Sequence, residues 1–198
     1  MATTIRPATR SDIPQILRFI RALAAYERAP EAVTATEAGL ERDGFGPNPF
    51  YFCLMAENDG RAAGFALYFF NYSTWLGRPG IYLEDLFVEP ELRGMGIGKA
   101  LLERVAGIAV EKGCQRFEWA VLDWNTPAIE FYRAMGAEFM DEWRNVRITG
   151  EALVNLAAPA DISAVADPSR APSIRRSSGE WVGNQKSKPS SKEIEASK

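Results

Sequence analysis

The spacing of apolar residues predicts an amphipathic helix near the start of the chain. Residues 13–26 carry apolar side chains at helical intervals, at positions 13, 16, 17, 20, 23 and 24. Ser11 and Asp12 precede this segment as helix-capping residues, and Pro30 follows its end. A second, shorter helix is expected over residues 36–42.

Further along, the pattern changes to short runs rich in aromatic and β-branched residues, which is typical of strands. Three strands are expected at residues 50–57, 61–72 and 82–88, and a short one at residues 5–7. Asn58-Asp59-Gly60 between the first two is a hairpin turn, and residues 73–80 form the next loop. These strands are therefore expected to form an antiparallel meander.

The last strand of the meander leads into a loop dense in glycine, residues 93–98, and then into a helix over residues 97–112. A strand at residues 115–123 follows, and a further helix starts after Asn125 and runs to Gly136. A strand, a crossover helix and a second strand in this order form a parallel pair. The sequence therefore predicts an α/β fold whose mixed central sheet is flanked by helices.

The end of the chain has a different character. Residues 138–147 predict a last strand or hairpin, and residues 151–157 a short terminal helix. Beyond it, serine, proline and lysine dominate, with Trp181 as the one aromatic residue. Such a composition cannot bury a core, so we expect residues 1–158 to form one domain and residues 159–198 to be disordered. The domain carries a net charge of −5, which suits a cationic substrate and equally suits ordinary solubility.

Composition excludes several classes of function. No run of eighteen apolar residues is present, and the N-terminus has no signal-peptide core, so we expect a cytoplasmic protein without membrane or nucleic-acid partners. Cys53 and Cys114 lie in apolar runs and are expected to be buried thiols; no metal-ligand spacing occurs, so no metal is expected. The chain has no histidine, so acid–base chemistry must come from carboxylates, tyrosine, lysine or water.

The glycine loop, residues 93–98, predicts a phosphate-binding site. Its three glycines let the backbone approach a ligand, the following helix directs free N–H groups at it, and Arg93 adds a cation. A P-loop is excluded because Ala100 stands where a serine or threonine must follow the lysine. A Rossmann loop is excluded because Lys99 replaces the third glycine. A simple chain reversal is the remaining structural alternative.

The loop and its neighbours resemble a known family. The order of Arg93, Gly96 and Gly98 resembles the coenzyme-A loop of the GNAT N-acetyltransferases. Further segments resemble the spermidine/spermine branch of that family, in the family's order: IRPATRSD, LAAYE, DGFGPNPFY, YLEDLFV, RGMGIGKALL and DWNTPAIEFYRAMGAE. This resemblance covers residues 5–156. It implies a GNAT fold with two splayed parallel strands, direct transfer of acetyl from acetyl-CoA to an amine, and, by analogy, a homodimer.

The resemblance implies an acetyl-CoA site. In the gap between the splayed strands, the backbone of residues 86–88 would pair with the pantetheine arm like an added strand; the same residues could equally be plain sheet core. The implied coenzyme-binding residues are Leu86, Phe87, Val88, Arg93, Gly94, Met95, Gly96, Ile97, Gly98, Lys99, Asn125, Pro127, Ala128 and Tyr132.

Two catalytic residues are implied as well. Tyr132 corresponds to the general acid that protonates the coenzyme-A sulfur, and a tyrosine retains its proton at neutral pH. Glu84 corresponds to the carboxylate on the base side, acting through a water molecule; the alternative is a strand-end salt bridge. Strand alternation is expected to turn Asp85 to the opposite face, as a structural residue.

The amine is expected to be held by carboxylates and aromatic rings, which suit an elongated cation. The implied substrate-binding residues are Tyr26, Glu27, Glu84, Glu118, Trp119, Ala120 and Asp141, with Glu142 as the alternative to Asp141. Three functions stay open: acetylation of polyamines or diamines, acetylation of lysine-like amino acids such as thialysine, and a non-catalytic acetyl-CoA-binding module. Tyr132 favours an enzyme, because a binding module needs no acid.

Overall fold

The structure is a computed structural model that describes residues 3–157. It divides into two units, Met1–Glu138 and Phe139–Lys198, which are considered separately below. The serine-rich tail, residues 159–198, and its predicted disorder lie outside the described residues.

A five-stranded mixed sheet runs through the first unit, in the strand order β1-β2-β3-β4-β5. The strands are β1 (Thr3–Pro7), β2 (Phe52–Asn58), β3 (Arg61–Ser73), β4 (Arg78–Val88) and β5 (Phe117–Trp119). The first four pair antiparallel in sequence order, and β5 lies parallel to β4 after the crossover through α3 (Ile97–Glu111). The predicted meander and parallel pair are confirmed.

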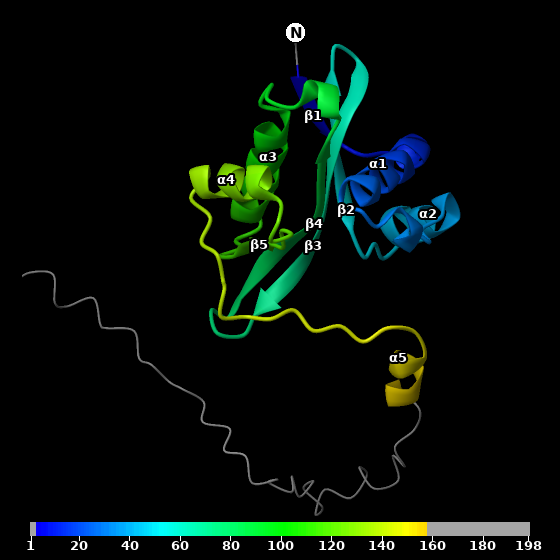
Figure 1. The fold of residues 1–198 in the computed structure, drawn as a ribbon, viewed down its shortest axis with the longest axis vertical. Helices are drawn as coiled ribbons and strands as arrows, with labels where there is room; N and C mark the ends of the chain where they lie inside the picture. Colours follow the sequence, from blue (N-terminus) through cyan, green and yellow to red (C-terminus); the bar gives the residue numbers. More distant parts are fainter. Residues whose placement is uncertain (1–2, 158–198) are drawn as a thin grey trace, which may run out of the picture. The chain divides into compact units, whose positions relative to one another are not determined.

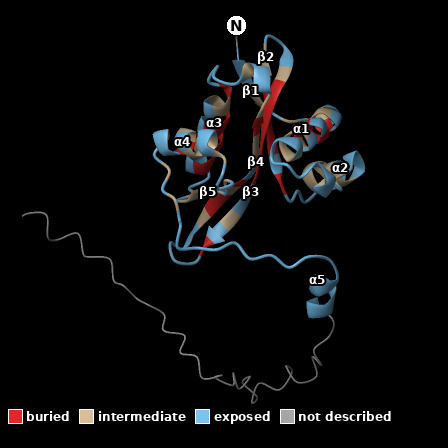
Figure 2. Ribbon diagram, viewed as in Figure 1, coloured by how far each residue is buried: buried red, intermediate tan, exposed pale blue. Residues whose placement is uncertain are grey.

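Helices cover both faces of this sheet (Figure 1). The helices α1 (Ile13–Tyr26) and α2 (Glu37–Phe45) lie on one side, and α3 and α4 (Thr126–Ala134) lie on the other. Short 3-10 turns occur at Arg10–Asp12, Pro30–Ala32 and Pro90–Leu92. Figure 2 shows that buried residues concentrate in the central strands and on the helix faces turned toward them.

The core beneath α1 is aromatic. Phe19 is fully buried; its ring stacks on Phe65 of β3 at 5.6 Å and lies 5.4 Å from Phe87 of β4. Cys53 is buried in the same cluster, as predicted, and burial raises the pKa of its thiol. Cys114 is only half-buried, which corrects the prediction that both thiols are buried; both are free. On the opposite face, α3 contributes fully buried aliphatic residues: Ile97, Leu101 and Val105.

Three element boundaries differ from the predictions. The strand expected at residues 115–123 shrinks to β5, because only three of its residues find a partner on β4. The helix α2 continues through Gly44, which packs against Tyr51: a Cβ there would lie 2.3 Å from the ring. The loop expected at residues 73–80 is shorter, since β4 already starts at Arg78.

In the second unit, the predicted strand or hairpin at residues 138–147 is wrong. This segment has the strand-like pattern but pairs with no strand among residues 3–157; instead, it contains a turn in which the Trp143 N–H donates to the Met140 carbonyl at 3.0 Å. The predicted terminal helix is confirmed as α5 (Gly150–Ala157).

An ion-pair network joins β1 to the start of α1. The Arg6 guanidinium donates to both carboxylate oxygens of Asp12 at 2.7 and 2.8 Å, and its Nε donates to Glu57 at 2.8 Å. Asp12 also accepts the Thr9 N–H at 2.7 Å. Arg6 holds the pKa of the Asp12 carboxyl well below its usual range.

Because its pKa is lowered on folding, Asp12 contributes stability that is present above its unfolded pKa and lost as the pH falls below it. We expect Asp12→Asn to lower the free energy of unfolding by about 1–3 kcal/mol at pH 7. The difference should shrink below about pH 4. Urea titrations at several pH values measure this. The matched control is Asp43→Asn, which removes a solvent-screened pair with Arg42 and should have a much smaller effect. Equal losses in both variants would contradict the prediction.

Candidate active site

The strands β4 and β5 separate soon after they meet. They pair over three residues only, and the last pair is Leu83 with Trp119. The next five residues of β4, 84–88, therefore have no partner on β5. This is the splayed arrangement expected from the sequence, and it leaves backbone groups of β4 open to a ligand on that side.

The end of α1 and the start of α4 approach each other beyond the end of β5. The Tyr26 hydroxyl donates to the Asn125 side-chain oxygen at 2.9 Å. That oxygen also accepts the Ala128 N–H at 3.4 Å and so caps α4, as predicted. The ring centroid of Trp124 lies 6.0 Å from that of Tyr26, and the Arg28 guanidinium lies over the Trp124 ring, 4.4 Å from its centroid. Sequence reasoning missed Arg28 and Trp124, although Trp124 stands inside the DWNTPA motif.

The glycine loop has the backbone that an anion site needs. Gly94 and Gly96 adopt positive φ angles of 80° and 83°, and a Cβ at either position would meet no atom within 4 Å. Gly96 is also the N-cap of α3, and no side chain caps the helix there, so the first N–H groups remain available to phosphate. The loop therefore fits a coenzyme pyrophosphate. Gly98 already lies in the first turn of α3 and is not needed for a left-handed conformation.

Arg93 bridges the loop, the end of β4 and α1. Its Nε donates to the Val88 carbonyl at 3.1 Å, and its guanidinium lies 4.8 Å from the Tyr26 ring centroid and 5.8 Å from that of Phe87. Within residues 3–157, no hydrogen bond or ion pair occupies its two terminal nitrogens. These contacts orient a cation next to the glycine loop. Lys99, by contrast, pairs with Glu103 along α3 at 3.5 Å.

We expect Arg93→Ala to weaken binding of acetyl-CoA about 10–100-fold, the usual contribution of charge-assisted hydrogen bonds. Titration calorimetry with the coenzyme measures the change. Arg42→Ala is the control, because Arg42 lies on α2 and pairs with Asp43. An unchanged dissociation constant in Arg93→Ala would remove Arg93 from the coenzyme site.

Tyr132 is buried on α4. Its ring centroid lies 5.0 Å from that of Trp119 and 5.3 Å from that of Phe131. Burial, together with the negative charge of Glu27, raises the pKa of Tyr132 to about 12. The hydroxyl therefore retains its proton at neutral pH, as a general acid must.

The two adjacent carboxylates on β4 are arranged differently from the prediction. Asp85 lies opposite Leu67 of β3, whereas the next residue of β3, Tyr68, lies opposite Leu83. Glu84 is therefore an extra residue, a β-bulge without a partner on β3, and it is exposed. The bulge breaks the alternation, so the prediction that simple alternation sets the faces of these two residues is wrong.

The structure places the other predicted substrate residues as follows. Glu27 is at the end of α1, and burial raises the pKa of its carboxyl. Glu118 is already engaged, 2.7 Å from the Arg116 Nε and accepting from Asn71 at 3.2 Å. Ala120 directly follows β5. Asp141 belongs to the second unit, so its role stays a prediction.

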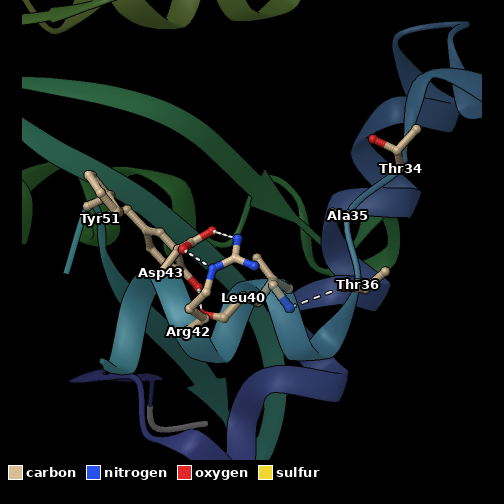
Figure 3. A pocket seen from close by; sticks show the side chains of 9 residues that line it. Thr34, Ala35, Thr36, Leu40, Arg42, Asp43 and Tyr51 are labelled. Atoms are coloured by element: carbon tan, nitrogen blue, oxygen red, sulfur yellow. Dashed lines mark hydrogen bonds and ion pairs between the residues drawn. The ribbon is translucent and has the colours of Figure 1, made fainter. Parts of the chain in front are cut away.

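A hollow of about 650 Å³ lies elsewhere, beside α2 and the start of β2 (Figure 3). Arg42 and Asp43 pair at 2.6 Å on its wall, and the Tyr51 hydroxyl donates to the Leu40 carbonyl at 2.7 Å. It contains none of the predicted site residues.

Across residues 3–157, no helix is long and apolar enough to cross a membrane, and no group of three acidic or cysteine side chains could hold a metal ion.

Comparison with known proteins agrees with this geometry. A sequence model of the acetyltransferase (GNAT) family matches residues 16–137. Thialysine N-epsilon-acetyltransferase of Sus scrofa is 46% identical, over 77% of this chain and 96% of its own length. Spermidine/spermine N(1)-acetyltransferase-like protein 1 of Homo sapiens is 39% identical, over 77% of this chain but only 23% of that protein.

Solved structures show the same fold. An integron cassette protein from the mobile metagenome of V. cholerae superposes with a TM-score of 0.68 at 27% identity, over 80% of this chain and 99% of its own. An aminoglycoside acetyltransferase from an uncultured soil metagenomic sample superposes at 0.61 and 19% identity, over 75% and 95%. The chain therefore belongs to the GNAT family, and it is an N-acetyltransferase.

Proposed function

We propose that this enzyme transfers acetyl directly from acetyl-CoA to a primary amine of a small polyamine- or diamine-like substrate. The observation that carries the proposal is a buried, protonated Tyr132 close to the Glu27 carboxylate, which in turn lies close to Asp85, the neighbour of Glu84 on β4. Within the described part of the chain, no hydrogen bond or ion pair neutralises any of these three carboxylates. Negative charge without a partner, beside an acid, suits a cationic amine.

The proposed mechanism follows from the positions of the residues. Coenzyme A would lie with its pyrophosphate on the glycine loop and Arg93, and with its pantetheine arm along residues 86–88 of β4. The thioester would then lie near Tyr132. A carboxylate on the base side takes a proton from the ammonium group, and the neutral amine attacks the thioester carbonyl. Tyr132 donates its proton to the departing thiolate. Residues Pro127 and Ala128 at the start of α4, together with Met95, Ile97 and Lys99, would complete the coenzyme site.

A lysine-like amino acid is the second candidate substrate. The thialysine acetyltransferase is the relative that shares most identity over most of both chains among those compared above. A lysine-like substrate also brings a carboxylate, which needs a cation. Arg28 offers one, since its guanidinium lies over Trp124 next to Tyr26.

An amine panel tests the proposal. The full chain is incubated with acetyl-CoA and, in turn, spermidine, putrescine, thialysine and a lysine-containing peptide, and free thiol is measured. We expect release with the polyamines and diamines. Preference for thialysine, abolished by Arg28→Ala, would establish the second candidate instead. Coenzyme binding without thiol release from any amine would identify a non-catalytic acetyl-CoA-binding module.

The family resemblance also leads us to propose a cytoplasmic homodimer. Sedimentation equilibrium of the full chain should give twice the chain mass. A monomer at the concentrations used in the assay would contradict the proposed assembly.

A further inference from the structure

The β-bulge at Glu84 determines which of two adjacent side chains of β4, Glu84 or Asp85, points toward α1. Asp85 is in register with Leu67, which belongs to the core cluster that contains Ile16 and Phe19 of α1. Residues that are directly opposite on paired strands point to the same face of the sheet. Asp85 therefore lies on the α1 face, where without the bulge Glu84 would stand.

Tyr132 reaches the same region from the other face. Its ring packs on Trp119, which is in register with Leu83. Leu83 in turn is opposite Tyr68, the neighbour of Leu67 on β3, and so points away from α1. Trp119 is also the last residue of β5. The tyrosine and the aspartate are thus on opposite sides of the sheet, at the level where β4 and β5 begin to separate.

The groups around Asp85 are acidic or neutral. Glu84 precedes it on β4, Glu27 approaches from the end of α1, and the Cys53 thiol lies on β2. Among residues 3–157, Asp85 has no hydrogen bond and no ion pair. Its half-buried position and these negative neighbours raise its pKa to about 7, with burial as the largest cause. A structural aspartate in a core would be expected to have a donor; this one has none.

We propose that Asp85 is the residue that accepts the proton from the substrate ammonium group, and that the exposed Glu84 passes this proton on to solvent. The inference rests on the proposed function and deepens it, because the base side was assigned to Glu84 alone. The amine would enter from the α1 face, toward Asp85, and the thioester would meet it at the gap. Acid and base then act from opposite faces on the two ends of the reaction.

The step balances in atoms and charge. One N–H bond of the ammonium breaks and its proton moves to the Asp85 carboxylate. The freed lone pair forms the C–N bond, and the C–S bond breaks. Tyr132 protonates the thiolate and regains a proton from the nitrogen of the newly formed amide. One proton per turnover leaves through Asp85 and Glu84 to water.

Two measurements test this assignment. In the first, the carboxyl carbon of Asp85 in the full wild-type chain is followed by NMR against pH without any substrate, assigned by its absence in Asp85→Asn. We expect a midpoint near pH 7. A midpoint near the ordinary aspartate value of about 4 would overturn the proposal. This readout does not require turnover, so it stands apart from the failure of the amine panel.

In the second, kcat/KM for the best amine of the panel is measured from pH 5 to 9. Below pH 7, kcat/KM should rise tenfold per pH unit, because Asp85 must be ionised to accept the proton. This acidic limb of the pH profile lies well below the ionisation of the amine at about pH 10. We expect Asp85→Asn to lower kcat/KM at least ~100-fold at pH 8 and to abolish this limb. Glu84→Gln should lower the rate and keep the limb. A limb that persists in Asp85→Asn and disappears in Glu84→Gln would make Glu84 the acceptor and overturn the proposal. Circular dichroism melting verifies that both variants are folded.

Discussion

Replacing Tyr132 by phenylalanine should lower kcat by about 10²–10⁴-fold, the usual contribution of a positioned general acid. The substitution retains the ring and its contacts with Trp119 and Phe131, and it removes only the hydroxyl. Without the hydroxyl the thiolate must leave without a proton. Because the pKa of Tyr132 is raised to about 12, no loss of activity from its deprotonation should occur below about pH 10.

The measurement is steady-state kinetics with a saturating amine, combined with calorimetric binding of acetyl-CoA. The dissociation constant of the coenzyme should be nearly unchanged, since the ring packing is preserved. Tyr51→Phe is a matched control: Tyr51 is also buried with a pKa raised to about 12, but its hydroxyl donates to Leu40 in the α2 region. That control should reduce stability and leave kcat intact. Wild-type turnover in Tyr132→Phe would exclude Tyr132 as the acid.

Replacing Phe19 by alanine should destabilise the fold by about 3–5 kcal/mol, the range for removing a fully buried aromatic side chain. Phe19 is fully buried between Phe65 of β3 and Phe87 of β4, so its loss would leave a cavity beneath the strand that carries the site. Since domains are stable by only about 5–15 kcal/mol, much of the variant should be unfolded at 37 °C.

Urea denaturation of the wild type and variant measures this loss. The control is Phe50→Ala, because the Phe50 side chain is 78% exposed and its removal should change stability by less than about 0.5 kcal/mol. The loss of free energy should accompany an unchanged m-value. A loss below 1 kcal/mol in Phe19→Ala would show that the aromatic cluster does not support the sheet.

Local signals explain which elements could be predicted. The helix α1 was predicted with its observed ends because its apolar spacing and the loop that follows it agree. Asp12 stands at the N-cap position, but its carboxylate makes no capping hydrogen bond to the helix and instead binds Arg6 and the Thr9 N–H. The hairpin at Asn58-Asp59-Gly60 is confirmed, with positive φ at Asp59 and Gly60. In α4, the Asn125 cap and the proline of the first turn specified the start of the helix.

The predictions that failed concern features that depend on residues far away in the sequence. Residues 138–147 have a strand-like pattern, but a strand exists only where another strand pairs with it, and none does among residues 3–157. The length of β5 depends on where β4 departs from it. The bulge at Glu84 is a mismatch of register between two strands, which no alternation within one strand reveals.

The sequence by itself determined the family, through motifs in a fixed order, and it narrowed the acid–base chemistry, since a chain without histidine must use carboxylates, tyrosine, lysine or water. It also determined the glycine loop, because Gly94 and Gly96 need positive φ angles. Only the tertiary structure decided how these parts meet. The contact of Tyr26 with Asn125 joins residues 99 positions apart. The face of Asp85 follows from strand register, a property of two strands that neither sequence segment encodes alone.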